Sequence, residues 1–166
     1  PFETPSGKIE IFSKRLYDRN DRDIPALSHY VPAIEGPEDA LTQQYPLQLI
    51  TWKGRNRANS TQFANPWLQE VQRQELWINP IDAKRRHITE GDRVKVHNDR
   101  GITMVPVKIT SRIMPGVVAL QAGAWWQPDE NGVDQGGCAN VLTSARSTAM
   151  AHGNAHQTLL VEVAKA

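Results

Sequence analysis

Hydrophobic and polar residues alternate over short distances in the part of the chain that follows residue 46. Alternation or a short apolar run occurs in residues 47–51, 76–78, 88–109, 117–120 and 159–163. A period of two places successive side chains on opposite faces, which is typical of β-strands. The pattern therefore predicts about six short strands, with a hairpin in the third of these segments, where Gly101 is suited to a positive φ.

Two short helices are expected between these strands. Pro66 begins one at residues 66–73, and Pro80 lies in the first turn of another at residues 79–86, where Asn79 is the expected N-cap. Short strands interrupted by short helices are typical of a closed barrel with helical crossovers. The predicted fold is thus mainly β with short helices.

The beginning of the chain has a different character. Residues 7–12 alternate like a short strand, and a few helical turns are expected to follow through Tyr17. Residues 18–46 show neither period, and we interpret them as an extended segment that wraps the outside of the barrel or is poorly ordered. The predicted organisation is a lead-in and wrapping segment at residues 1–45 and a barrel at residues 46–166.

Composition excludes several classes of protein. A chain of 166 residues that is 39% hydrophobic can bury one core, and a formal net charge of +1 gives no general attraction for nucleic acid or a membrane surface. No apolar run is long enough to predict a membrane span. The start at Pro1 does not resemble a signal peptide, and the missing initiator Met leads us to expect a fragment. Cys138 is the only cysteine, so this sequence holds no cysteine set for a disulfide or an iron–sulfur cluster.

Several motifs in a fixed order carry a family resemblance. Residues 88–101, Ile-x-x-Gly-Asp-x-Val-x-Val-x-Asn-Asp-x-Gly, resemble the hairpin of a double-psi β-barrel. The other motifs are Arg57-x-Asn-Ser60, Asn79-Pro-x-Asp-Ala83, Pro115-Gly-Val-Val118, Gly123-Ala-Trp-Trp126, Asn140-Val-Leu-Thr143, Gly153-Asn154 and Gln157-Thr158. In this order they resemble the C-terminal molybdopterin dinucleotide-binding domain of the dimethyl sulfoxide reductase family, in particular that of the anaerobic dimethyl sulfoxide reductase catalytic subunit.

The resemblance implies a double-psi β-barrel that binds molybdopterin guanine dinucleotide inside a larger subunit. That subunit would take an oxygen atom from dimethyl sulfoxide or a related S- or N-oxide at a molybdenum centre, and its iron–sulfur cluster would lie in an N-terminal part outside this chain. Implied partners are the remaining domains of the subunit, an iron–sulfur electron-transfer subunit and a membrane anchor subunit. The implied location is periplasmic and membrane-associated through those partners, with no direct membrane insertion and no nucleic acid.

The residues that we expect to bind the cofactor come from five places in the sequence. They are Thr51, Trp52, Lys53, Arg57, Asn59, Ser60, Thr61, Asn79, Asp82, Trp125, Asn140, Asn154, His156 and Gln157. No residue of the chain is predicted to be catalytic or to bind a metal.

The basic loop at residues 52–61 combines three cations with Gly54 and short polar side chains, which suits the binding of phosphate. The alternative is a solvated basic loop, since charged runs usually face water. A similar choice concerns Asn79 and Asp82. Asp82 could accept hydrogen bonds from guanine, but capping of the following helix explains both residues equally well.

Residues 121–143 contain several glycines and two adjacent tryptophans. Gly123, Gly132, Gly136 and Gly137 are expected to let the backbone approach a ligand closely, and Trp125 is expected to stack on a flat ring beside Asn140. The alternative is a large surface loop in which Trp126 packs on the barrel.

Two histidines four residues apart, His152 and His156, lack the carboxylate and the helical pattern of a metal site, and Gly153 lies between them. No nucleophile elbow, phosphate-binding P-loop or Gly-x-Gly-x-x-Gly motif is present either. We therefore expect this chain alone to be inactive. The alternatives that the sequence leaves open are the equivalent domain of a formate dehydrogenase, a nitrate reductase or a polysulfide reductase, and a non-enzymatic binding barrel.

Overall fold

The computed structural model describes residues 1–155 and 157–166. The chain forms two compact units. One consists of Pro1–Pro32 with Arg146–Asn154, and the other of Ala33–Ala145 with Ala155–Ala166. The second unit contains the strands, and it is the unit that positions the candidate site.

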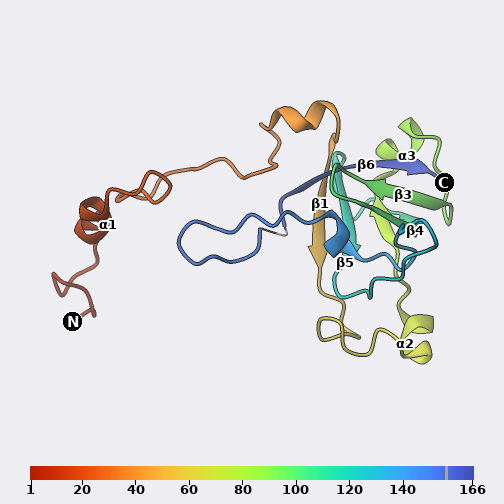
Figure 1. The fold of residues 1–166 in the computed structure, drawn as a ribbon, viewed down its shortest axis with the longest axis horizontal. Helices are drawn as coiled ribbons and strands as arrows, with labels where there is room; N and C mark the ends of the chain where they lie inside the picture. Colours follow the sequence, from red (N-terminus) through yellow and green to blue (C-terminus); the bar gives the residue numbers. More distant parts are fainter. Residues whose placement is uncertain (156) are drawn as a thin grey trace. The chain divides into compact units, whose positions relative to one another are not determined.

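Six strands of the second unit close into a barrel (Figure 1). In the order in which they are hydrogen-bonded around the barrel they are β1 (Leu47–Trp52), β5 (Val117–Gln121), β2 (Leu76–Ile78), β4 (Ile102–Ile109), β3 (Arg93–His97) and β6 (Leu159–Lys165). The pairs β1–β5 and β2–β4 are parallel, and the other pairs are antiparallel. This closed barrel with short crossing helices confirms the predicted mainly β, double-psi-like fold.

The helices begin where the sequence predicts them. Helix α2 (Pro66–Val71) begins after Asn65, whose side chain accepts hydrogen bonds from two backbone N–H groups of the first turn. Helix α3 (Pro80–Arg85) begins after Asn79, which caps Ile81 in the same way. The other helices are α1 (Lys14–Arg19) in the first unit and the short 3₁₀ turns η1 (Ala40–Gln43) and η2 (Ala139–Leu142) in the second.

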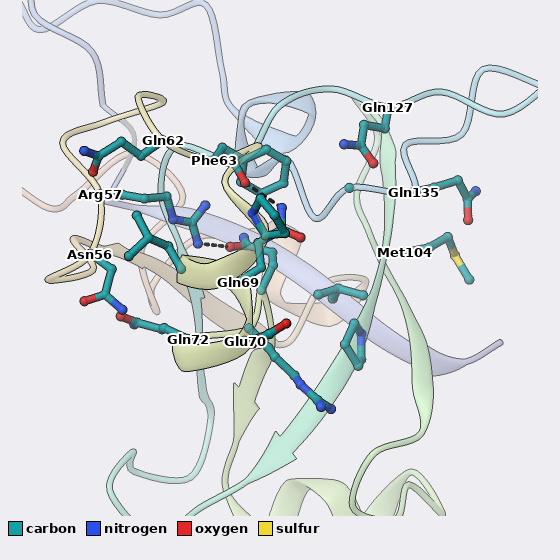
Figure 2. Close-up of a pocket in the computed structure, with 17 residues that line it drawn as sticks. Asn56, Arg57, Gln62, Phe63, Gln69, Glu70, Gln72, Met104, Gln127 and Gln135 are labelled. Atoms are coloured by element: carbon teal, nitrogen blue, oxygen red, sulfur yellow. Dashed lines mark hydrogen bonds between the residues drawn. The ribbon is translucent and has the colours of Figure 1, made fainter.

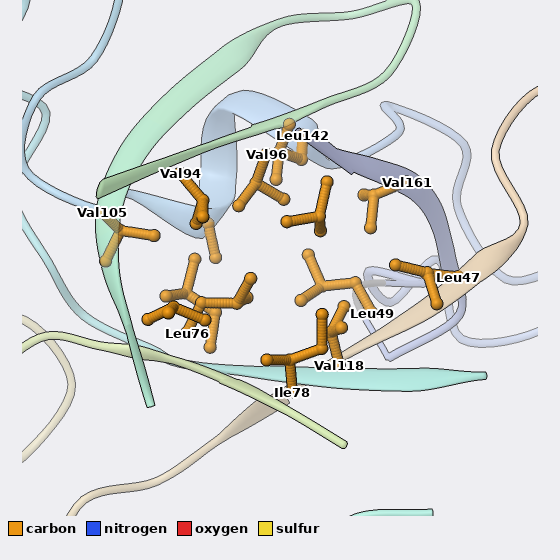
Figure 3. Close-up of a cluster of buried hydrophobic side chains, with 14 of the residues drawn as sticks. Leu47, Leu49, Leu76, Ile78, Val94, Val96, Val105, Val118, Leu142 and Val161 are labelled. Carbon is orange, nitrogen blue, oxygen red and sulfur yellow. The ribbon is translucent and has the colours of Figure 1, made fainter. Parts of the chain in front are cut away.

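The core fills the inside of the barrel with aliphatic side chains (Figure 3). Strand β1 illustrates how alternation supplies this core: Leu47 and Leu49 are buried, while the residue between them is partly exposed. Burial of one such side chain stabilises the fold by about 1.5–3 kcal/mol. The side chains labelled in Figure 3 belong to all six strands and to η2: Leu47, Leu49, Leu76, Ile78, Val94, Val96, Val105, Val118, Leu142 and Val161.

Part of the irregular segment before β1 packs on the barrel. The Glu35 carboxylate, 5% exposed, accepts hydrogen bonds from the Arg100 guanidinium at 2.8 Å and from the Leu160 backbone N–H at 3.1 Å. Tyr45 is buried against His97, with an edge-to-face ring contact at 6.2 Å between the ring centroids. The part of this segment from Ala33 to β1 therefore belongs to the barrel unit.

Two local predictions were wrong. Residues 7–12 do not form a strand, because only Phe12 pairs, through a single bridge with Leu27. Gly101 does not have a positive φ. Instead, a Cβ at this position would lie 2.6 Å from the carbonyl oxygen of Val141, so the glycine allows the hairpin to approach η2. The helical turns expected up to Tyr17 are confirmed as α1, which begins after Ser13 as its N-cap.

None of the helices that the structure describes is both long enough and apolar enough to cross a membrane.

Candidate functional site

The strand directions bring several of the predicted polar residues to one end of the barrel. Because β1 and β5 are parallel, their last residues, Trp52 and Gln121, are paired. Strand β6 is antiparallel to β1, so Gln157, just before it, reaches Thr51. The Gln157 amide accepts a hydrogen bond from the Thr51 N–H at 3.0 Å and donates to its carbonyl oxygen at 2.8 Å and its hydroxyl at 2.9 Å. We call this end of the barrel the loop end.

The basic loop that follows β1, residues 53–61, is braced by its own side chains. The ammonium group of Lys53 donates to the Asn59 side-chain oxygen at 2.6 Å, and the Thr61 hydroxyl donates to the Ala58 carbonyl at 2.6 Å. Among the described residues, no carboxylate forms an ion pair with the loop cations Lys53, Arg55 and Arg57. The loop therefore presents positive charge that the described part of the chain does not neutralise.

Arg57 points inward, toward two glutamines that the sequence did not single out. Its Nη2 donates to the side-chain oxygens of Gln74 at 2.7 Å and Gln121 at 2.5 Å. The guanidinium carbon lies 5.1 Å from the centre of the Phe63 ring. Burial lowers the pKa of Arg57 below its usual value, although a guanidinium stays charged at neutral pH.

Gln74 also connects two other segments of the loop end. Its amide nitrogen donates to the carbonyl oxygens of Gln121 at 2.8 Å and Gly137 at 2.9 Å. One glutamine thus links the basic loop, the end of β5 and the loop of residues 122–137 between β5 and η2, which we call the glycine-rich loop. Sequence reasoning missed Gln74 because the only available signal was a glutamine just before a predicted strand, which has no characteristic spacing to its partners.

Three buried hydrogen-bond donors at this end have no acceptor within the described residues. They are the indole nitrogen of Trp52, Nη1 of Arg57 and the amide nitrogen of Gln121. The Trp52 ring packs against Trp77, with 4.9 Å between the ring centroids. Buried polar atoms are nearly always hydrogen-bonded in folded proteins. These donors are buried, but Lys53 and Arg55 nearby are exposed and have no carboxylate partner among the described residues, so their charge suits the loop end to a partner rich in hydrogen-bond acceptors.

A buried carboxylate organises the glycine-rich loop. Asp134 is fully buried. Its Oδ1 accepts hydrogen bonds from the backbone N–H groups of Gln127 at 2.8 Å and Gly136 at 3.2 Å, and its Oδ2 accepts from the Thr103 hydroxyl at 2.5 Å and the Cys138 N–H at 2.7 Å. The sequence did not identify Asp134, since a single Asp between glycines is also common in exposed turns.

The glycines of this loop bring protein segments together. A Cβ on Gly123 would lie 1.8 Å from the Asn59 carbonyl oxygen, and one on Gly137 would lie 2.7 Å from Cγ of Gln74. Gly136 is similarly close to the carbonyl of Trp125, at 2.5 Å. At these three glycines the backbone comes close to other protein segments. The prediction that they let the backbone approach a ligand was therefore wrong for them. Gly132 has a positive φ of 77° in an open turn.

Both tryptophans are exposed. The indole of Trp125 donates to the Ser60 carbonyl at 2.8 Å and is 49% exposed. Trp126 is 60% exposed, so the suggestion that it packs on the barrel was wrong. With Asn140, which is exposed on η2, they line an open depression of about 620 Å³. Its lining residues are Ser60, Ala124, Trp125, Trp126, Cys138, Asn140 and Val141. Burial raises the pKa of the Cys138 thiol, which keeps that group neutral beside the depression.

A second hollow of about 510 Å³ lies between the loop that contains Arg57 and Phe63 and the segments that contain Met104, Gln127 and Gln135 (Figure 2). Amide side chains dominate its lining. In Figure 2, Arg57 and Phe63 project from one wall, and Gln127 and Gln135 belong to the opposite wall. The Phe63 and Trp125 rings, with centroids 6.1 Å apart, lie between this hollow and the open depression.

Asn79 and Asp82 lie at the other end of the barrel, because β2 is antiparallel to β5 and leads away from the loop end. The Asn79 amide donates to the Ile113 carbonyl at 2.7 Å while its oxygen caps α3, and the Asp82 carboxylate accepts from the Gly116 N–H at 2.6 Å. Both side chains therefore have structural partners, and the structure does not bring them together with the basic loop.

Two further predicted residues do not belong to the loop end as described. Asn154 is part of the first compact unit, where it forms a single bridge with Ser147. His156 lies outside the described residues.

Comparisons with known proteins agree with this architecture. The family model described as "Molydopterin dinucleotide binding domain" matches residues 47–160. The chain is 46% identical over 172 residues to the dimethyl sulfoxide reductase DmsA of Escherichia coli strain K12, covering 99% of this chain and 21% of that protein. The dimethyl sulfoxide/trimethylamine N-oxide reductase of Rhodobacter capsulatus is 37% identical, with 99% of this chain and 21% of that protein covered.

A solved structure supports the fold independently. Acetylene hydratase from Pelobacter acetylenicus superposes with a TM-score of 0.80 over 98% of this chain and 24% of that chain, at 16% sequence identity. At this identity the match shows the fold alone. The chain spans about a fifth of the length of the curated relatives that it matches. Since the family model covers most of the chain, including the strands that carry the loop end, the chain belongs to the molybdopterin dinucleotide-binding domain family.

Proposed function

We propose that the loop end binds molybdopterin guanine dinucleotide as part of a larger catalytic subunit that reduces dimethyl sulfoxide or a related S- or N-oxide. Family membership supports a role in binding a molybdopterin cofactor. The choice of substrate is supported by the names of the relatives, which are dimethyl sulfoxide and trimethylamine N-oxide reductases. The single observation that carries the proposal is the pair of exposed cations at the loop end, Lys53 and Arg55, which have no carboxylate partner among the described residues.

The chemistry of this end fits a dinucleotide. Phosphate oxygens and the polar edges of pterin and guanine are rich in acceptors, and the exposed cations Lys53 and Arg55 have no carboxylate partner among the described residues. The cofactor, when bound, supplies the molybdenum at which an oxygen atom is transferred. The chain supplies binding, orientation and electrostatics.

Individual residues have different parts in this proposal. Trp125 presents an exposed flat face held in place by its hydrogen bond to Ser60, and Asn140 presents an amide from η2 on the same depression. We assign direct contacts to the Ser60, Trp125 and Asn140 side chains, and an electrostatic role to Lys53. Gln157 fixes Thr51 at the end of β1 and thereby orients the start of the basic loop.

The proposal extends to the rest of the enzyme. We infer that the iron–sulfur cluster lies in an N-terminal part of the subunit outside this chain, and that an iron–sulfur electron-transfer subunit and a membrane anchor subunit complete a periplasmic complex. The guanine form of the dinucleotide is part of the same proposal. On this view the 166-residue chain alone is folded but inactive, because the other surfaces that enclose the cofactor belong to domains outside it.

The test uses the full-length subunit with Asn140→Ala and Ser60→Ala. Each variant should lower the guanine nucleotide released on denaturation by roughly threefold to tenfold, the effect of one lost hydrogen bond. The matched controls are Asn131→Ala and Ser111→Ala, which remove exposed side chains of the same kind outside the depression. Unchanged nucleotide content in the test variants, or a wild-type subunit without guanine nucleotide, would refute the proposal.

A further inference from the structure

We propose that Arg57, Gln74 and Gln121 act together as a positioning device, and we call these three residues the amide clamp. In this proposal the clamp fixes the loops of the cofactor site relative to one another and does not touch the cofactor. The inference rests on the proposed function, because it concerns how the same site is held in shape. It assigns to Arg57 a role different from the phosphate contact that the sequence suggested.

The clamp connects three segments that are far apart in the sequence. Arg57 belongs to the basic loop, Gln74 precedes β2, and Gln121 ends β5. Arg57 donates to both glutamine oxygens, and Gln74 donates in turn to the backbone carbonyls of Gln121 and Gly137. A single connected set of four hydrogen bonds therefore holds the basic loop, β5 and the glycine-rich loop together.

Glycines make room for the clamp. A Cβ on Gly54 would lie 1.6 Å from the amide nitrogen of Gln121, and one on Gly137 would lie 2.7 Å from Cγ of Gln74. Real Cβ atoms do not come this close to other heavy atoms, because the repulsion is too strong. Each clamp glutamine thus lies against a position from which a side chain is excluded.

Both terminal nitrogens of Arg57 are either engaged or buried. Its Nη2 is engaged by two amide oxygens, and its Nη1 has neither an acceptor among the described residues nor exposed surface. The Phe63 ring covers a face of the guanidinium. A phosphate could reach Nη1 only if the loop moved, and it could bind Nη2 only in competition with the two amide oxygens. The charge of Arg57 strengthens its hydrogen bonds to the amides, since bonds to an ionised donor are stronger than neutral ones.

Substitutions at Gln121 separate positioning from direct contact. Gln121→Met removes the acceptor for Arg57 but leaves the charge of Arg57 in place. Gln121→Glu keeps an acceptor oxygen for Arg57 but adds a negative charge beside it. The amide nitrogen that it replaces by a second oxygen has no partner in the described structure. If Arg57 bound the cofactor directly, Gln121→Met would be harmless and Gln121→Glu would weaken binding by neutralising the cation.

The experiment compares full-length subunits that carry Arg57→Ala, Gln121→Met, the double substitution or Gln121→Glu. We expect each of the first two to lower guanine nucleotide content by roughly tenfold, the effect of losing a hydrogen bond to a charged group. We expect the double variant to lose no more than either single variant, because residues of one network are not additive. Gln121→Glu should keep the wild-type content. The control is Gln48→Met, which removes a glutamine of the barrel that donates to the Leu159 carbonyl outside the clamp.

A second readout is independent of the cofactor. In cofactor-depleted subunit, hydrogen exchange should become faster in residues 53–61 and 122–137 of Arg57→Ala and Gln121→Met, and stay unchanged in the barrel strands and in Gln121→Glu. Wild-type exchange together with wild-type nucleotide content in Gln121→Met would overturn the inference. So would additive losses in the double variant. A wild-type subunit without guanine nucleotide but with faster loop exchange in the variants would instead refute the proposed function and leave the clamp intact.

Discussion

Replacement of Asp134 by alanine should destabilise the barrel unit far more than replacement of any other carboxylate in the glycine-rich loop. The side chain has no exposed surface and accepts four hydrogen bonds, three of them from backbone N–H groups. Alanine would leave at least the Thr103 hydroxyl and the Cys138 N–H buried without an acceptor. Each such orphaned group costs about 1–3 kcal/mol, which sums to about 2–6 kcal/mol before relaxation.

Thermal or urea unfolding of the 166-residue chain measures this loss. A decrease of about 3 kcal/mol in the free energy of unfolding corresponds to a fall in Tm of about 6–12 °C for a chain of this size. Asp129→Asn is the matched control, because Asp129 also accepts backbone hydrogen bonds, from Asn131 and Val133, but is exposed. The reasoning fails if Asp134→Ala costs less than about 1 kcal/mol, the range expected for the exposed control.

Three further outcomes are expected. Gly123→Ala should lower the free energy of unfolding by at least about 1–2 kcal/mol, because φ is +93° and the new Cβ would meet the Asn59 carbonyl; a wild-type Tm would contradict this. Burial and the nearby Lys95 lower the pKa of His97 in the folded chain below its usual value of 6.5. As the pH falls below 6.5, the histidine is protonated more readily in the unfolded chain than in the folded chain, so the free energy of unfolding should decrease. His97→Asn should remove that part of the pH dependence in urea titrations at pH 7.5 and 5.5. Glu35→Gln should cost about 1–3 kcal/mol and speed hydrogen exchange in residues 33–45, whereas unchanged exchange there would contradict its anchoring role.

The barrel could be predicted from sequence because its strands and helices depend on local chemistry. Short alternating or apolar runs identified β1 and β6, and prolines located the starts of α2 and α3, the latter together with Asn79 as its cap. The beginning of the chain was less predictable. Residues 7–12 alternate like a strand, but a strand also needs a partner, and only Phe12 has one.

The candidate site was only partly predictable, because the relative positions of its loops depend on contacts between segments that are distant in the sequence. Residues 53–61 and Trp125 were each expected to contact the cofactor, and the hydrogen bond from Trp125 to Ser60 brings them together. No local sequence pattern around Gln74 and Gln121 predicts their contact with Arg57. Asn79 and Asp82 were counted among the cofactor-binding residues because Asp82 could accept hydrogen bonds from guanine, yet the direction of β2 places them at the opposite end of the barrel.

The close fit of Gly54, Gly123 and Gly137 against other loops limits how this domain can be recombined. Each glycine faces an atom from a segment distant in sequence: the Gln121 amide, the Asn59 carbonyl and the Gln74 side chain, respectively. If a single loop were transferred from a relative into this scaffold, a glycine and the neighbouring segment that leaves no space for a Cβ there would no longer match each other. We expect chimaeras to fold well only when the basic loop, the segment before β2 and the glycine-rich loop are exchanged as one unit.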